Sequence, residues 1–185
     1  MKCSPQLTNF LPGLVMRSSR WLRFGWDFLG GKKVQGVGIN LTRRCNTLCD
    51  YCKIVDNSAE KRKREQSVED WKNIIKRFSD HNHRHFIFTG GEPLVYRGVY
   101  ELVDFASTLA MTSMISNTIL LDRSTFAKLA NLDFLTFSFD TLSEVHTKNS
   151  LSKLKLIKEE CHRYSITVSS IVTITAHNIH EIPGI

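Results

Sequence analysis

From about residue 34 onward, short apolar runs alternate with longer amphipathic stretches. The apolar runs have the composition of β-strands, and they cover residues 34–41, 86–88, 114–116, 134–139 and 166–175. Between them, apolar side chains recur at helical spacing within residues 67–78, 99–110, 124–130 and 151–161. Five strands separated by four helices predict an α/β protein in which a parallel sheet is built from βαβ units.

Composition narrows the class of protein further. The chain has 185 residues, of which 42% are hydrophobic, enough for a core of its own. Charged residues make up 23% and aromatic residues 10%, which excludes a disordered, collagen-like or coiled-coil protein. The formal net charge is +7, a moderate basic excess. The apolar runs are too short to cross a bilayer, and the first residues contain no cleavage site of a secretory signal.

The first 33 residues precede the alternation and form an N-terminal extension to a core domain at 34–185. The extension mixes basic and aromatic side chains: Arg17, Arg20, Arg23, Trp21, Phe24, Trp26 and Phe28. One interpretation is a basic amphipathic helix that makes peripheral contact with a membrane. The interpretation we favour is a helix that packs its aromatic side on the core domain.

Three of the five cysteines lie within eight residues. Cys45, Cys49 and Cys52 follow the first predicted strand, whereas Cys3 and Cys161 stand alone. This distribution indicates a metal site in a reducing compartment, the cytoplasm, rather than a disulfide framework. Three thiolates are too few for a closed zinc site, but they suit a four-iron four-sulfur cluster with one open iron. Structural zinc remains the alternative.

A glycine-rich turn, Thr89-Gly90-Gly91-Glu92-Pro93, follows the second predicted strand. Two glycines allow the backbone to approach a ligand that a Cβ atom would push away. In a parallel α/β fold, ligands gather at the carboxyl ends of the strands, so this turn and the cysteine loop are expected on the same face.

The segment Cys45-Asn-Thr-Leu-Cys49-Asp-Tyr-Cys52 resembles the signature loop of the radical S-adenosylmethionine (radical SAM) enzymes. The Gly-Gly-Glu-Pro turn is similar to the turn by which these enzymes bind the amino group of S-adenosylmethionine. The pattern is closest to the peptide-modifying and molybdopterin-precursor (SPASM-like) branch. The resemblance implies a partial (β/α) barrel of the TIM type, usually with six βα units. About five are present here, so we expect the core domain to be incomplete at its C-terminus.

The resemblance also implies the cofactors and their ligands. Cys45, Cys49 and Cys52 would hold the [4Fe–4S] cluster, whose open iron chelates S-adenosylmethionine. The residues implied in cofactor binding are Tyr51 beside the adenine, Gly90, Gly91, Glu92 and Pro93 in the turn, and Ser138 and Asp140 near the ribose and carboxylate. An equally supported interpretation of Asp140 is the N-cap of the turn that follows it. Ser116-Asn117-Thr118 resembles a Thr-Asn-Gly turn of the family, but the glycine is missing.

The implied reaction is the reductive cleavage of S-adenosylmethionine to a 5′-deoxyadenosyl radical, which abstracts hydrogen from the substrate. The expected partners are an external electron donor of the flavodoxin or ferredoxin type and a peptide or small-molecule substrate. The basic run at 61–64 leaves open an RNA-modifying enzyme as an alternative. A non-catalytic metal-binding fragment is the other alternative. The sequence singles out no general acid or base.

Two further groups of residues are assigned structural roles. His81, His83 and His85 precede the second predicted strand, at the end of the sheet opposite the cysteine loop. We interpret them as polar turn residues rather than as metal ligands. Cys161 lies on an apolar helix face and is expected in the core.

Overall fold

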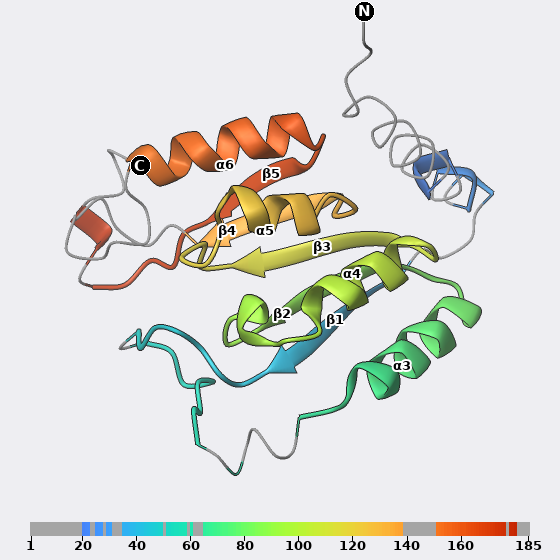
Figure 1. Ribbon diagram of the computed structural model, residues 1–185, viewed down its shortest axis with the longest axis horizontal. Coiled ribbons are helices and arrows are strands. Elements are labelled where there is room, and N and C mark those ends of the chain that lie inside the picture. The colour runs from blue at the N-terminus through green and yellow to red at the C-terminus, as the bar shows by residue number, and fades with distance from the viewer. Residues whose placement is uncertain are drawn as a thin grey trace, which may run out of the picture.

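The protein is organised around one sheet of five parallel strands (Figure 1). The computed structural model describes residues 20–22, 25–27, 29–30, 35–49, 51–58, 60, 65–138, 151–176 and 178–180. The strands are β1 (Gln35–Thr42), β2 (His83–Gly90), β3 (Met111–Ser116), β4 (Phe134–Ser138) and β5 (Thr167–Ile171). Each strand pairs with the one that follows it in the chain, so the spatial order is β1-β2-β3-β4-β5. This order confirms the predicted βαβ architecture.

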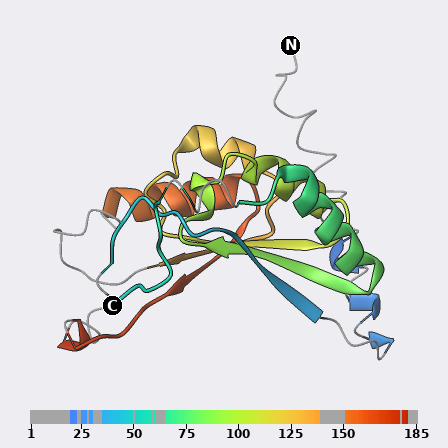
Figure 2. The ribbon, with the colours of Figure 1, turned by 90° about the horizontal axis from the view of Figure 1, so that it is seen from below.

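The connections between the strands place helices on one face of the sheet (Figure 2). They are α3 (Val68–Asp80), the short 3-10 helix η1 (Pro93–Val95), α4 (Val99–Ser107), α5 (Arg123–Lys128) and α6 (Leu151–Arg163). Ser67 and Asp70 form a capping box at the start of α3. Within the described residues, no helix is both long and apolar enough to span a lipid bilayer.

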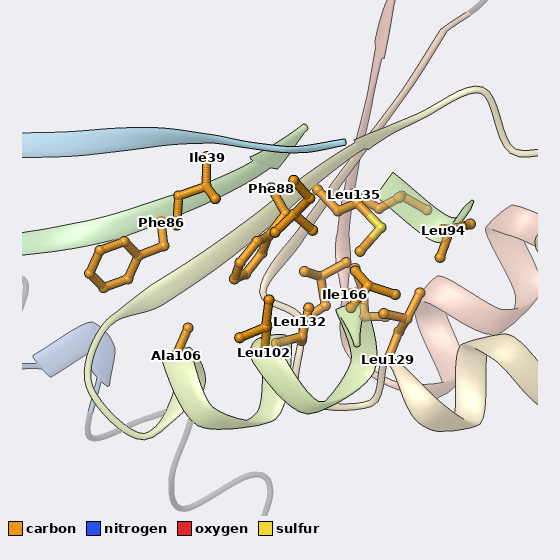
Figure 3. Close-up of a cluster of buried hydrophobic side chains, with 14 of the residues drawn as sticks. Ile39, Phe86, Phe88, Leu94, Leu102, Ala106, Leu129, Leu132, Leu135 and Ile166 are labelled. Carbon is orange, nitrogen blue, oxygen red and sulfur yellow. The ribbon is translucent and has the colours of Figure 1, made fainter. Parts of the chain in front are cut away.

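The hydrophobic core lies between the sheet and these helices (Figure 3). Alternate residues of β2, Phe86 and Phe88, are fully buried, because successive side chains of a strand point to opposite faces. Leu102 of α4 and Leu135 of β4 belong to the same cluster of buried side chains. The core therefore holds the strands in one sheet, and the sheet places the ends of the strands, and the loops that follow them, relative to one another.

The fifth strand differs from the prediction. The apolar run predicts a strand over residues 166–175, but β5 covers only Thr167–Ile171, and all five of its residues are exposed. The apolar side chain that is buried in this segment is Ile166, just before the strand begins. In the described part of the chain, β5 pairs with β4 alone, so it forms an edge of the sheet.

The histidine prediction is also partly wrong. β2 begins at His83, so His83 and His85 belong to the strand and only His81 lies in the turn. The His85 ring makes a short hydrogen bond with the Ser113 hydroxyl on β3, and burial lowers the pKa of His85 because the charged imidazolium loses its hydration.

The N-terminal extension is attached at the amino-terminal end of the sheet, where its described part is drawn in blue (Figure 1). Arg20 donates to Asp133 at 2.9 Å and to the carbonyl oxygen of Ser107 at 2.6 Å. Asp27 accepts from Arg84 at 3.2 Å. All four side chains of these two ion pairs are largely buried. Among its described residues, the extension therefore packs on the core domain through these two ion pairs and through the ring of Trp21, which contacts Phe134.

Loss of the Arg20–Asp133 pair is expected to weaken the whole fold. The Asp133 side chain also accepts from the backbone N–H of Thr112 at 2.8 Å, and an Asp133→Asn change leaves the Arg20 charge buried without its counter-ion. We expect the free energy of unfolding to fall by about 3 kcal/mol. The matched control is Asp80→Asn, which removes an exposed pair with Lys76 and should change stability by no more than about 0.5 kcal/mol. Urea unfolding measures both, and equal effects would contradict the prediction.

Candidate active site at the carboxyl ends of the strands

The cysteine loop follows β1 directly and is the chemically distinctive part of the molecule. Cys45, Cys49 and Cys52 are free thiols of intermediate burial, and none of them forms a disulfide. Thr47 lies between the first two: its hydroxyl oxygen is 3.2 Å from the sulfur of Cys45 and 4.0 Å from that of Cys49. The backbone N–H of Cys52 donates to the carbonyl oxygen of Cys49 at 2.9 Å, which curls the loop.

The donor set of this loop fits an iron–sulfur cluster by number and by chemistry. Three reduced thiols on one loop are the soft ligands that iron–sulfur clusters require, and three ligands leave one iron of a [4Fe–4S] cluster open. The described residues bring Cys45 and Cys49 to a shared hydroxyl but do not gather three such side chains at one metal position. The residues therefore suit the cluster by their number and by their chemistry.

Hydrogen bonds close the cysteine loop at its two ends. The N–H of Asp56 donates to the carbonyl oxygen of Arg43 at 2.9 Å, and the N–H of Cys45 donates to the Asn57 side chain at 3.0 Å. The Arg43 side chain also donates to the carbonyl oxygen of Ile54 at 3.1 Å. The ends of the loop are thus joined, and the three thiols lie on the closed segment.

An ion pair that sequence reasoning missed supports the entry to the loop. Arg44 makes two parallel hydrogen bonds to Glu65, at 2.8 and 2.9 Å, and both side chains are largely buried. Glu65 also accepts from the Thr42 hydroxyl. Arg44 reaches the carbonyl oxygen of Val95 in η1 as well, at 3.3 Å. No periodicity or motif spacing distinguishes Arg44 or Glu65 from other charged residues.

The Gly-Gly turn at the end of β2 packs against the same entry. A Cβ atom on Gly91 would lie 2.3 Å from the carbonyl oxygen of Arg44, and one on Gly90 would lie 2.4 Å from that of Thr42. Gly90 also has a φ of +142°, which favours glycine. The N–H groups of Gly91 and Glu92 donate to the carbonyl oxygens of Thr42 and Arg44 at 2.8 and 2.9 Å. The close approach that requires glycine here is therefore to the backbone of the cysteine loop.

Glu92 has a fully buried side chain with 0% exposure, and it links β2 to β3. One carboxylate oxygen accepts from the N–H of Leu94 at 3.1 Å and from the Ser116 hydroxyl at 2.9 Å. The other oxygen accepts from the N–H of Asn117 at 2.8 Å. A buried carboxylate is tolerated only with such donors, so Glu92 fixes the backbone just after β3.

Asn117 carries this connection on to the cysteine loop. Its side-chain amide donates to the Asn46 side chain at 2.7 Å and lies 3.6 Å from the sulfur of Cys45. Its side-chain oxygen accepts from the N–H of Ile119 at 3.1 Å, which orients the amide. The ends of β1, β2 and β3 therefore form one hydrogen-bonded unit. The sequence indicated Asn117 only because Ser116-Asn117-Thr118 resembles a turn of the family. It did not predict the contact of Asn117 with the cysteine loop.

Thr118 occupies the position where that family turn has glycine. It is fully buried with a φ of +67°, a conformation that is strained for a β-branched residue. Two hydrogen bonds hold it: its N–H donates to the Ser116 hydroxyl at 3.0 Å, and its carbonyl oxygen accepts from Leu121 at 3.0 Å. The turn thus keeps a left-handed backbone although the glycine is missing.

The other residues that the sequence predicts at the site lie in different parts of the chain. Tyr51 is exposed on the cysteine loop, and Pro93 is buried at the start of η1. Ser138, partly buried, ends β4 at the same edge of the sheet. Asp140, the basic run 61–64 and Cys3 lie outside the described residues.

Cys161 is buried in α6, as expected. Burial raises the pKa of its thiol to about 12, assisted by the nearby Glu160, so it remains protonated and unreactive.

The fold and this site define a partial α/β barrel that carries three thiols at its functional edge. The family model of the radical SAM superfamily matches residues 39–185. The chain therefore belongs to the radical SAM superfamily, whose enzymes use a [4Fe–4S] cluster and S-adenosylmethionine. This result confirms the family and the fold that the sequence predicts.

Several curated relatives are similar to parts of this chain. The GTP 3′,8-cyclase of Chlorobaculum tepidum is 33% identical over 116 residues, which are 60% of this chain and 34% of that protein. The Fe-coproporphyrin III synthase of Methanosarcina barkeri is 29% identical over 79% of this chain and 38% of its own. The PqqA peptide cyclase of Bradyrhizobium diazoefficiens is 24% identical over 80% of this chain and 41% of its own. The chain thus spans well under half the length of these relatives.

Solved structures agree on the fold. The structure described as native anSMEcpe with bound AdoMet and Kp18Cys peptide superposes with a TM-score of 0.64 at 20% identity, over 80% of this chain and 46% of that one. Streptococcus suis SuiB superposes with a TM-score of 0.53 at 17% identity, over 78% of this chain and 41% of its own.

The packing of Gly91 gives a direct test of the link between the turn and the cysteine loop. In a Gly91→Ala variant, the added methyl group would meet the Arg44 carbonyl group, so the loop must move. We expect a loss of about 2 kcal/mol in the free energy of unfolding and a lower iron content after anaerobic reconstitution. The matched control is Gly38→Ala in β1, where nothing lies within 4 Å of the added methyl group and no loss is expected. Full iron binding in the Gly91→Ala variant would contradict the prediction.

Proposed function

We propose that this chain binds a [4Fe–4S] cluster through Cys45, Cys49 and Cys52 and cleaves S-adenosylmethionine reductively. When bound, the cluster supplies the electron for this cleavage, and the resulting 5′-deoxyadenosyl radical abstracts hydrogen from a substrate. The substrate we favour is a peptide or a small molecule, and the electron donor is an external protein of the flavodoxin or ferredoxin type. The observation that carries the proposal is the hydrogen-bonded unit that joins the cysteine loop to the ends of β2 and β3.

The turn after β2 is suited to binding an ammonium group. The N–H groups of Gly91 and Glu92 are occupied by the carbonyl oxygens of Thr42 and Arg44. With these two donors occupied, we propose that the turn binds a ligand through its carbonyl oxygens. A protonated amine, such as that of the methionine moiety, needs acceptors, whereas a phosphate group needs donors.

The other proposed cofactor contacts come from different elements. Tyr51 is exposed beside the thiols, where its ring is accessible to an adenine. Ser138 ends β4 and offers a hydroxyl group at the same edge of the sheet. We assign Asp140, two residues further on, to the same ligand. The side chain of Glu92 acts indirectly, because its oxygens already accept three hydrogen bonds from Leu94, Ser116 and Asn117.

The test compares the cysteines of the loop with the buried one. Anaerobically reconstituted protein should contain iron and acid-labile sulfide in equal amounts, and with dithionite it should release 5′-deoxyadenosine from S-adenosylmethionine. Cys45→Ala, Cys49→Ala and Cys52→Ala should each abolish that release and bleach the visible absorbance. Cys161→Ala removes a thiol from α6, away from the loop, and should leave both signals intact.

Two outcomes would contradict the proposal in different ways. Stoichiometric zinc without sulfide would show a structural metal site instead of an iron–sulfur cluster. An intact cluster that never yields 5′-deoxyadenosine would show that the chain binds the metal centre without carrying out the cleavage.

A further inference from the structure

Three large apolar side chains of the N-terminal extension face away from the protein. Leu22 is 73% exposed, Trp26 is 79% exposed and Leu29 is 84% exposed. All three have helical backbone, and their spacing of four and three residues places them along one side of a helix. We call these three residues the outer stripe.

The opposite side of the same helical segment is fixed to the core domain. Arg20 and Asp27 are seven residues apart, about two turns, so their side chains lie on one side of the helix. Both are buried in ion pairs, with Asp133 and Arg84 respectively. Trp21 flanks this side and packs on the ring of Phe134, with 5.4 Å between ring centroids. The two ion pairs set the rotation of the helix, so the outer stripe points outward.

The charge of the extension indicates what the outer stripe contacts. Residues 1–33 contain six Lys and Arg and a single acidic residue, Asp27, and so hold five of the seven net positive charges of the chain. Arg20 and Asp27 are both paired with core residues, so the net charge of the extension comes from its other five Lys and Arg residues. Exposed Leu and Trp within a segment of basic composition are typical of segments that lie in the interface of an anionic membrane. Single-stranded RNA would instead require stacking side chains, and two of the three stripe residues are aliphatic.

We propose that the N-terminal extension is a peripheral anchor that binds the surface of anionic membranes through Leu22, Trp26 and Leu29. The extension lies at the amino-terminal end of the sheet, whereas the cysteine loop lies at the other end (Figure 1). An anchored molecule therefore keeps its cysteine loop away from the lipid and accessible from the aqueous phase. This anchor is independent of the cluster, so it can be tested on protein without iron.

The test is flotation of the full chain with lipid vesicles. Vesicles of equal parts phosphatidylcholine and phosphatidylglycerol should bind the protein, and pure phosphatidylcholine should bind it at least about tenfold more weakly. Binding to the anionic vesicles should weaken as salt is added. Trp26→Glu should reduce it at least about tenfold, whereas Ile179→Glu, at an exposed apolar residue outside the extension, should leave it unchanged. Circular dichroism checks that both variants remain folded.

Three results would overturn the proposal. The first is equal binding to neutral and anionic vesicles, and the second is wild-type binding by Trp26→Glu. The third is binding to an oligouridine RNA that depends on Trp26 without any binding to vesicles, which would assign the outer stripe to nucleic acid. A Glu substitution at Leu29 repeats the test at a second position of the stripe if Trp26→Glu does not fold.

Discussion

The buried carboxylate of Glu92 is the interaction on which the geometry of the site depends. A carboxylate removed from water is stable only when donors replace its hydration, and Glu92 receives three, from Leu94, Ser116 and Asn117. Through these bonds, the end of β2 determines the backbone path after β3. Asn117 then contacts the first part of the cysteine loop, at Asn46 and at the sulfur of Cys45, so the ends of β2 and β3 help to position this part of the loop.

The site combines this polar network with very close backbone packing. Gly90 and Gly91 let the turn after β2 contact the entry of the cysteine loop, where any larger residue would collide with carbonyl oxygens. Thr118 has a left-handed backbone conformation, which costs about 1–3 kcal/mol, and its hydrogen bonds to Ser116 and Leu121 maintain that conformation. A strained backbone conformation of this kind persists only where contacts with the surrounding residues outweigh the residue's own conformational preference. The protein therefore holds the cysteine loop from several directions.

The sequence predicted the parts that follow from pattern and spacing. Alternating periodicities gave the five strands and four helices, and the cysteine triplet with the Gly-Gly turn indicated the family. It did not predict the extent of β5, because the apolar pattern of 166–175 cannot tell a buried strand from an exposed edge. It also missed the pairing of Arg44 with Glu65 and the attachment of the extension through Arg20 and Asp27. These contacts join residues far apart in the chain, and no local pattern marks them.

The most direct test of this account is the hydrogen exchange of backbone amides in a Glu92→Gln variant. Gln has the same shape as Glu, but its NH₂ group can only donate hydrogen bonds. This group must face one of the groups that now donate to Glu92, so at least one hydrogen bond is lost. We predict that exchange at Asn117, Thr118 and Cys45 becomes at least about tenfold faster, as a loss of roughly 1.4 kcal/mol would cause, while the centres of β2 and β3 keep their protection. Unchanged exchange at these three amides would contradict the claim that Glu92 holds the site together.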